Sequence, residues 1–364
     1  MPKTKRIRKV NKTSLAEQVK AESKKSIKSK IKKEKKPKVV ESNNKISYNG
    51  DRISTGSLLL DLACGGPETP GMPGGIMVVG YGPSGSGKTV LACEIAGNIL
   101  RAGGELDYKD SEARLNKDFA AIFGLKHEDM KYDRPNTIPE AIRPLYKWQV
   151  DKSKINGYII DSLAALSTDI EMDNEDGDKM GMRRAKEFSE HLRKGARIVA
   201  DNNILLFCTN QIREKADAQK FERKDINPGG KAIEFYASLI FRFSNIKPIR
   251  AEVNVAGKKV KRDVGMEATI EVVKSSIWKP HRSAPIILYF DYGIDDIRAN
   301  LQYIKDFTSN KVYQVKDIKL SNSMDEAIKQ VEEEGLEKKL RKQVIELWSS
   351  IENKFKIERK RKER

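Results

Sequence analysis

Eight consecutive residues combine spaced glycines with a lysine and a hydroxyl, which is a set suited to holding phosphate. They match the pattern G-x-x-x-x-G-K-[ST] and run Gly82, Pro83, Ser84, Gly85, Ser86, Gly87, Lys88 and Thr89. The glycines let successive backbone N–H groups turn inward around a phosphate. The lysine reaches the β- and γ-phosphates, and the hydroxyl holds Mg²⁺. The spacing therefore predicts a binding site for ATP with Mg²⁺.

An aspartate ends the apolar run Tyr158, Ile159, Ile160 and Asp161. Ligands of open parallel sheets gather outside the carboxyl ends of the strands, so this side chain should lie beside the phosphate loop. A carboxylate there would hold Mg²⁺ directly or through water. Many strands end in aspartate, so the assignment depends on the loop.

Two more polar residues follow expected strands. Glu112 comes after the short run 105–108, and Gln211 comes after the run 205–210. ATP hydrolysis needs a carboxylate that orients and deprotonates water, which Glu112 would supply. The Gln211 amide would sense the γ-phosphate and pass its state to the next loop. From the residues alone, Glu112 could equally be a solvated acid, and Gln211 could equally cap a turn.

A long polar loop is expected after Gln211, because the segment 213–231 has few apolar residues and ends in Pro228, Gly229 and Gly230. Its cations suit the phosphates of single-stranded nucleic acid, and Phe221 offers an apolar face to bases. A merely solvated surface loop is the alternative. The cations are Arg213, Lys215, Lys220, Arg223, Lys224 and Lys231.

Short apolar runs alternate with helical patterns through the middle of the chain, which predicts an α/β fold with a mainly parallel, doubly wound sheet. This order places the phosphate loop between a strand and a helix. A small segment, 301–364, would follow the core at 47–300. The expected strands are 76–81, 157–161, 204–210, 267–274 and 286–290, and the expected helices are 89–102, 180–202 and 324–356.

The positive charge belongs to the two ends of the chain. Of a formal net charge of +18, residues 1–46 hold 17 Lys and Arg against 4 Glu, a net of +13. Residues 338–364 hold 11 against 4, a net of +7, which leaves the centre near −2. We expect 1–46 to be a largely disordered basic arm that either meets an acidic partner or only adds solubility.

Three cysteines, Cys64, Cys93 and Cys208, lie far apart without CxxC pairing, so a zinc site or a disulfide framework is not expected. No run of 18 apolar residues predicts a membrane span, and the start of the chain lacks the apolar stretch of a secretory signal. These features predict a soluble protein of the cytoplasm.

Together these motifs resemble the RecA family of homologous-recombination ATPases, over residues 53–295. The resemblance implies a RecA-like P-loop core with ATP and Mg²⁺ as cofactors. The stretches that carry it are Ile53-Ser54-Thr55-Gly56-Ser57, Tyr81–Thr89, Asp161-Ser162-Leu163-Ala164-Ala165-Leu166, Asn210-Gln211-Ile212-Arg213, Gly229-Gly230-Lys231-Ala232 and Phe235-Tyr236-Ala237-Ser238.

The resemblance implies roles for residues around the nucleotide. Glu112 falls where the family keeps its water-activating glutamate, and Gln211 where a glutamine couples ATP to DNA. Phe119 matches the aromatic residue that stacks on adenine, and Asn116 the polar residue beside the base. Lys274 matches the first of two lysines that reach the ATP of the neighbouring subunit.

One position departs from the family. Ser276 occupies the place of the second lysine, where Lys279 or Arg282 could substitute. The basic ends also differ from the acidic tail typical of bacterial members, so the chain resembles a phage-type or otherwise divergent recombinase. If it is phage-encoded, it would act in the cytoplasm and nucleoid of the bacterial host.

The resemblance also implies two DNA-binding loops. Residues 175–184 resemble the first loop, and 213–230 resemble the second. Phosphate contacts from such loops position DNA but do not read its sequence. The implied contacts come from Met180, Gly181, Arg183, Arg184, Arg213, Phe221, Arg223, Lys224, Gly229, Gly230 and Lys231.

The implied function is that of an ATP-dependent DNA recombinase with DNA-dependent ATPase activity. It would assemble into a helical filament on single-stranded DNA, pair it with double-stranded DNA and exchange strands. Loading proteins or single-strand-binding proteins are further expected partners. Two alternatives stay open: another DNA motor of the same fold, such as a helicase or branch-migration ATPase, and an accessory protein of a recombinase.

Overall fold

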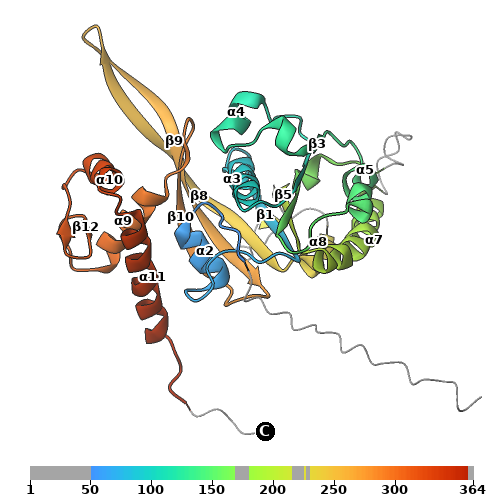
Figure 1. The fold of residues 1–364 in the computed structure, drawn as a ribbon. Coiled ribbons are helices and arrows are strands. Elements are labelled where there is room, and N and C mark those ends of the chain that lie inside the picture. Colours follow the sequence, from blue (N-terminus) through green and yellow to red (C-terminus); the bar gives the residue numbers. More distant parts are fainter. Residues whose placement is uncertain (1–50, 169–179, 215–224, 227–229, 360–364) are drawn as a thin grey trace, which may run out of the picture. The chain divides into compact units, whose positions relative to one another are not determined.

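One large sheet organises the structure (Figure 1). The computed structural model describes residues 51–168, 180–214, 225–226 and 230–359, all within one unit, Asn49–Arg364. The sheet strands of this part are β1 (Ile76–Gly82), β2 (Leu106–Asp110), β3 (Lys131–Asp133), β4 (Asn156–Asp161), β5 (Ile204–Gln211), β8 (Leu239–Val255), β9 (Lys258–Ser275), β10 (Ser283–Tyr289) and β11 (Gly293–Ile294). Their order is β11-β10-β9-β8-β1-β5-β4-β2-β3.

The half of the sheet from β8 to β3 is parallel. Strands β1 and β4 are buried along their whole length, which explains why they consist of continuous apolar runs rather than alternating ones. Neighbouring residues of β1 point to opposite faces: Ile76 and Val78 join one buried cluster, and Met77 and Val79 join another. The predicted doubly wound, mainly parallel sheet is confirmed.

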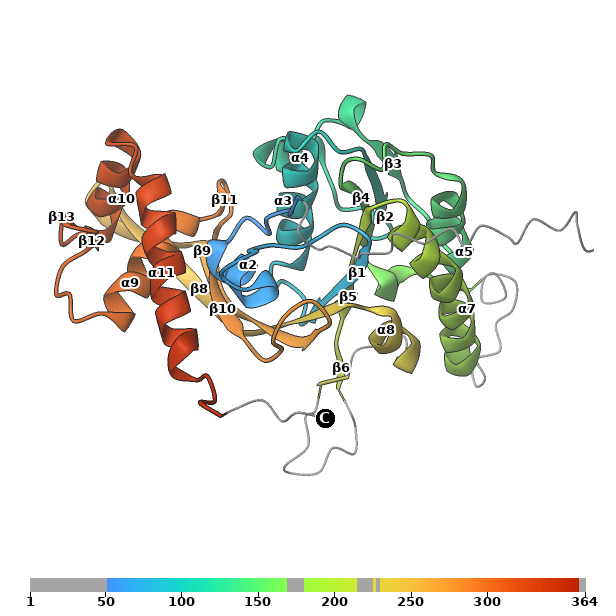
Figure 2. The same ribbon diagram turned by 60° about the horizontal axis from the view of Figure 1, so that its bottom comes forward.

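Helices cover both faces of this half of the sheet. On one face α3 (Lys88–Arg101) packs into the first cluster, which also contains residues of α2 (Leu58–Gly65). On the other face lie α5 (Ile138–Ile142), α7 (Met180–Asp201) and α8 (Gly230–Tyr236), and Figure 2 shows α5 and α7 side by side. The core therefore consists of two apolar layers with the sheet between them.

The other half of the sheet is antiparallel: β8 pairs with β9, β9 with β10, and β10 with β11. The strand expected at 267–274 is present as part of β9, and the one expected at 286–290 overlaps β10 as far as Tyr289. Strand β9 is far longer than predicted, because with β8 it forms a hairpin that turns at Ala256 and Gly257, both with positive φ. In Figure 1 this hairpin extends away from the helices.

The region after the sheet contains three helices, α9 (Asp296–Phe307), α10 (Met324–Glu333) and α11 (Glu337–Lys354). The prediction of a single helix over 324–356 is wrong, because the chain turns at Gly335, whose φ is +60°. Glycine adopts this left-handed conformation without steric cost and so ends α10. A short β pair, β12 (Gln314–Val315) and β13 (Ile318–Lys319), lies between α9 and α10.

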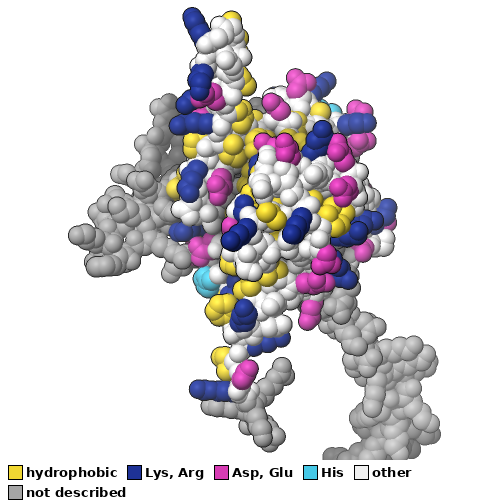
Figure 3. Space-filling view, turned by 90° about the vertical axis from the view of Figure 1, so that its left-hand side faces the viewer, with side chains coloured by type: hydrophobic (Ala, Val, Ile, Leu, Met, Phe, Trp, Pro, Cys, Tyr) yellow, Lys and Arg dark blue, Asp and Glu magenta, His cyan; other side chains and the backbone are white. Residues whose placement is uncertain are grey.

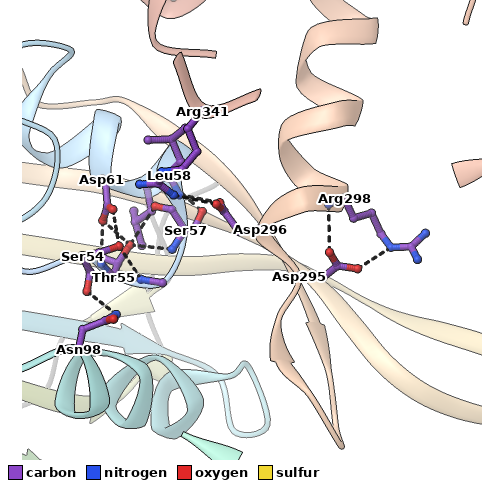
Figure 4. A network of polar contacts seen from close by, with 12 residues as sticks. Ser54, Thr55, Ser57, Leu58, Asp61, Asn98, Asp295, Asp296, Arg298 and Arg341 are labelled. Carbon is purple, nitrogen blue, oxygen red and sulfur yellow. Dashed lines mark hydrogen bonds and ion pairs between the residues drawn. The ribbon is translucent and has the colours of Figure 1, made fainter. Parts of the chain in front are cut away.

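A buried carboxylate ties the segment before α2 together (Figure 4). Asp61 accepts bonds from the Ser54 hydroxyl (2.5 Å), the Thr55 amide (2.7 Å) and the Thr55 hydroxyl (2.7 Å). Asn98 of α3 in turn donates to the Ser54 carbonyl at 3.0 Å. Burial raises the pKa of Asp61 to about 6, although these donors oppose the shift. The network therefore joins α2 to the helix that follows the phosphate loop.

A second carboxylate, Asp296, links α2 to the C-terminal helices (Figure 4). Asp296 accepts from the Leu58 amide at 2.7 Å and from Arg341 of α11 at 3.0 Å. Asp295 caps α9 by accepting from the Arg298 amide at 3.0 Å. Helices α9 and α11 are thus fixed to the start of the core by partly buried polar contacts as well as by packing.

The remaining elements are short. No helix in the described ranges combines the length and apolar character that a bilayer crossing needs. The remaining short elements are α4 (Lys117–Ile122), η1 (His127–Asp129), η2 (Arg143–Lys147), η3 (Leu163–Ala165), β6 (Arg213–Glu214) and β7 (Asp225–Ile226).

Candidate active site

The phosphate loop joins the carboxyl end of β1 to the amino end of α3, as predicted. Gly85 and Gly87 have φ of +70° and +88°, a conformation that other residues rarely adopt. At Gly82 a Cβ atom would come within 2.7 Å of the Phe243 Cβ, so β8 packs directly against the start of the loop. The glycines therefore give the loop its curvature, and its N–H groups adjoin the positive end of a helix.

The Lys88 side chain lies along the inside of this loop. Its ammonium donates to the carbonyls of Gly82 (3.1 Å) and Pro83 (2.7 Å) and to the Ser86 hydroxyl (3.4 Å). Burial lowers the pKa of Lys88, while the carboxylates of Asp161 and Glu112 act in the opposite direction. The partly desolvated Lys88 ammonium is bonded to neutral carbonyl oxygens. An anion such as phosphate would compensate its positive charge better than these carbonyls do, so the ammonium is well placed to bind one.

Asp161 lies beside the loop at the end of β4 and is 5% exposed. It accepts from the hydroxyls of Thr209 and Tyr108, the latter at 3.2 Å, and it is hydrogen-bonded to Thr89. Burial raises the pKa of Asp161. Two hard oxygen donors, one carboxylate and one hydroxyl, fit Mg²⁺, which needs few protein ligands when phosphates and waters supply the rest.

Glu112 lies at the centre of a hydrogen-bond cluster. Its Oε1 accepts from the Ser162 hydroxyl at 2.7 Å and from the Gln211 side-chain amide at 3.0 Å. Its Oε2 pairs with Arg114 Nη1 at 3.1 Å. The Glu112 side chain is 15% exposed, so it is neither a fully solvated acid nor a core residue. Strands β2, β4 and β5 together position this carboxylate.

A cavity of about 230 Å³ brings the predicted chemical groups together. Arg114 also lines it, and its role was not predicted, because no motif marks an arginine two positions after the candidate base. Among the residues that line the cavity are Ser84, Gly85, Ser86, Gly87, Lys88, Thr89, Glu112, Arg114, Asp161 and Gln211.

Asn116 and Phe119 lie at the start of α4 and are not among the residues that line this cavity. Asn116 is the N-cap, with its side-chain oxygen accepting from the Phe119 amide at 2.8 Å. The Phe119 ring packs edge-on against Phe123, with 5.2 Å between centroids. Both residues therefore have local structural roles, and their contact with adenine stays a prediction.

Lys274 lies near the end of β9 and is not among the residues that line the cavity. Its ammonium donates to the carbonyls of Glu234 (2.5 Å) and Phe235 (3.3 Å), at the end of α8. Burial lowers the pKa of Lys274. The two proposed substitutes for the second lysine have another partner: Lys279 and Arg282 both pair with Glu352 of α11, at 2.9 and 2.7 Å.

The first predicted DNA loop, 175–184, lies mostly outside the described residues. Its end forms the first turn of α7, where Met180, Gly181 and Arg183 lie, and of these only the backbone is described. Arg184 donates to the carbonyls of Leu163 (3.0 Å) and Ala164 (2.8 Å), which anchors α7 to the segment after Asp161. Its phosphate contact stays a prediction.

The second predicted DNA loop begins directly after Gln211. Arg213 and Glu214 form β6, which pairs with β7, so the base of the loop is a short antiparallel ladder. Helix α8 begins at Gly230 and contains Lys231, a residue that was predicted to lie in the loop. Phe221, Arg223, Lys224 and Gly229 lie outside the described residues.

Comparisons with known proteins agree with this geometry. The family described as RecA N-terminal domain matches residues 20–295. The chain is 33% identical to Protein RecA of Thermus thermophilus over 250 residues, 68% of this chain and 69% of that protein. It is 29% identical to Protein RecA of Borrelia hermsii over 306 residues, 81% and 83% of the two chains. The chain therefore belongs to the RecA family of ATP-dependent recombinases.

Proposed function

We propose that this protein couples ATP hydrolysis to single-stranded DNA and uses that coupling for homologous pairing and strand exchange. The observation that carries the proposal is the 3.0 Å bond from Gln211 to Glu112. Glu112 is the candidate base, and Gln211 is the last residue of the strand that leads into the second candidate DNA loop. One hydrogen bond thus joins the chemistry to the segment proposed to touch DNA.

The phosphate loop would bind the triphosphate of ATP through its backbone N–H groups, and Lys88 would exchange its carbonyl partners for phosphate oxygens. Thr89 and Asp161 would hold Mg²⁺. When bound, Mg²⁺ neutralises charge on the β- and γ-phosphates. Because Lys88 and Asp161 are both buried, this charge compensation is favoured by the low dielectric of the site.

Glu112 would orient a water molecule and accept its proton as the water attacks the γ-phosphate. Ser162 and Gln211 both donate to Oε1, which fixes the direction of the carboxylate. Arg114 holds Oε2 from the solvent side and is 70% exposed, so its side chain is free to turn toward phosphate. A change at Gln211 on DNA binding would then alter the position of the Glu112 carboxylate.

Assembly into a filament on single-stranded DNA would place Lys274 next to the ATP of a neighbouring subunit. The proposal is supported by the position of Lys274, which bonds carbonyls at the end of α8 rather than lining the cavity of its own chain. The chain would divide into a basic arm, 1–46, an ATPase core, 47–300, and a C-terminal segment, 301–364, whose helices pack against the core.

Electron microscopy and a strand-invasion assay test this function. With a slowly hydrolysed ATP analogue we expect regular filaments on single-stranded DNA, and with ATP we expect joint molecules between a single strand and a homologous duplex. Lys88→Ala is the control, since it removes the phosphate-binding ammonium. Closed rings that unwind duplexes without forming joint molecules would instead identify a motor of the helicase class.

A further inference from the structure

The hairpin of β8 and β9 continues far beyond the sheet. Strand β8 pairs with β1 only at 239–242, and β9 pairs with β10 only at 265–271. Among the described strands, residues 246–264 pair only within the hairpin of β8 and β9, so they form a two-stranded ribbon. At about 3.3 Å per residue, its arms are roughly 30 Å long. Figure 1 shows this ribbon projecting from the sheet.

The ribbon carries a net positive charge, although the central part of the chain to which it belongs does not. Residues 246–264 contain six cations against Glu252 and Asp263, whereas 47–337 as a whole carries a net charge near −2. All six cations belong to exposed residues. In Figure 3 the hairpin at the top shows Lys and Arg beside hydrophobic side chains. The cations are Lys247, Arg250, Lys258, Lys259, Lys261 and Arg262.

On one face of the ribbon every cation has an acidic partner. The cross-strand pairs Arg250–Asp263, Glu252–Lys261 and Asn254–Lys259 share this face, because residues paired across strands point to the same side. Asp263 lies 3.0 Å from Arg250, and Glu252 lies 3.0 Å from Lys261 and 2.8 Å from Lys259. We call it the ion-pair face.

The opposite face, here called the valine face, comprises Ala251, Val253, Val255 and Val260 with Lys258 and Arg262 beside them. Val253 and Val255 are each 56% exposed. Neither Lys258 nor Arg262 has an ion-pair partner within the described part of the chain. An isolated two-stranded ribbon is only marginally stable in water, so an apolar face flanked by unpaired cations favours a partner that covers it.

We propose that the valine face binds double-stranded DNA in the major groove, with Lys258 and Arg262 on phosphates. The major groove is about 12 Å wide and admits a two-stranded β-ribbon. Apolar side chains there contact thymine methyl groups, and the flanking cations replace counterions on the phosphates. This inference rests on the proposed function in one respect, namely that the protein acts on DNA.

The test measures duplex binding without nucleotide, by fluorescence anisotropy of a labelled 30-base-pair duplex over a series of salt concentrations. For Lys258→Gln with Arg262→Gln we expect affinity to fall roughly tenfold and the salt slope to fall by about 2, because two phosphate contacts are lost. The control on the ion-pair face, Lys259→Gln with Lys261→Gln, removes the same charge, and the remote control is Lys152→Gln with Lys154→Gln. Both controls should change affinity by less than about threefold.

Equal losses in the two ribbon variants would overturn the assignment to the valine face, and unchanged affinity in Lys258→Gln with Arg262→Gln would overturn the duplex site. Loss of filaments on single-stranded DNA with normal duplex affinity would show that a second copy covers this face, which also contradicts the inference. ATP hydrolysis on single-stranded DNA separates the two proposals. If the variant Lys258→Gln with Arg262→Gln keeps DNA-stimulated hydrolysis, the proposed function is retained even if its duplex affinity shows no role for the ribbon.

Discussion

The side-chain amide of Gln211 donates a 3.0 Å hydrogen bond to Oε1 of Glu112, across 99 positions of sequence. Glu112 follows β2 and Gln211 ends β5, two strands of the parallel half of the sheet that are separated only by β4, so the fold rather than the local sequence brings them together. The same Glu112 oxygen also accepts from Ser162 at 2.7 Å. Because Ser162 and Gln211 donate to the same oxygen, variants of the two can be compared. The comparison separates the positioning of the Glu112 carboxylate from the coupling of hydrolysis to DNA.

Replacing Gln211 should uncouple hydrolysis from DNA. In Gln211→Ala and in Ser162→Ala, we expect ATP hydrolysis without DNA to fall by roughly tenfold, because each loses one hydrogen bond to a charged group. Only Gln211→Ala should also lose the response to single-stranded DNA, since Ser162 does not lie on the strand that enters the second loop. Steady-state ATPase assays with and without DNA compare the two variants. An equal DNA response in both would contradict the coupling role.

Replacing Glu112 should remove proton abstraction and leave nucleotide binding intact. Glu112→Gln keeps the size of the side chain but cannot accept a proton, so kcat should fall by about 10²–10⁴. Affinity for a fluorescent ATP analogue should stay within about threefold, because Lys88, Thr89 and Asp161 are untouched. Glu128→Gln, an exposed acid of η1, is the control. A variant that keeps wild-type kcat would show that another group activates water.

Asp61 should make stability depend on pH. Its pKa is raised by burial from 3.8 to about 6, so the native state favours the protonated form. Its contribution is present below about pH 4 and lost as pH rises through 6, and the shift corresponds to at most about 3 kcal/mol. The free energy of unfolding of wild type minus that of Asp61→Asn should therefore fall from pH 4 to 7 and then level off. Denaturant unfolding at several pH values measures it, and a flat difference would contradict the assignment.

Glu352 should hold α11 against the turn between β9 and β10. Its carboxylate accepts from Arg282 at 2.7 Å and from Lys279 at 2.9 Å, and Arg282 is the main cause of its lowered pKa. Glu352→Gln should lower the free energy of unfolding by about 1–3 kcal/mol, because these bonds are charge-assisted. The matched control is Glu346→Gln, whose partner on the same helix is 4.0 Å away. Equal stability of the two variants would show that the pair is only a surface contact.

Much of the fold follows from local sequence, and much of the site follows from its motifs. Residues 76–81 form a continuous apolar run, which predicts a strand buried on both faces. The pattern from Gly82 to Thr89 predicts a phosphate loop that leads into a helix. The ribbon at 246–264 was not predictable, because cations on both faces remove the alternation that marks a half-buried strand. Gly335 was missed because an isolated glycine does not interrupt the apolar pattern of the helices around it.

Contacts between distant elements were also beyond the sequence. The pairing of Lys279 and Arg282 with Glu352 depends on how α11 packs, and it occupies the two cations that the sequence suggested as substitutes for a second lysine. Arg114 carries no motif, yet it lies 3.1 Å from Glu112. The role of Asn116 as the N-cap of α4 was not predicted either, and its contact with the base stays a prediction.

The central claim is that DNA controls hydrolysis through Gln211 and Glu112. The most direct test is the rate of ATP hydrolysis by the full chain with and without saturating single-stranded DNA, with Lys88→Ala as a check for contaminating activity. We predict that DNA raises the wild-type rate by about tenfold or more, which is at least 1.4 kcal/mol of barrier lowering. A wild-type rate that is the same with and without DNA would contradict it.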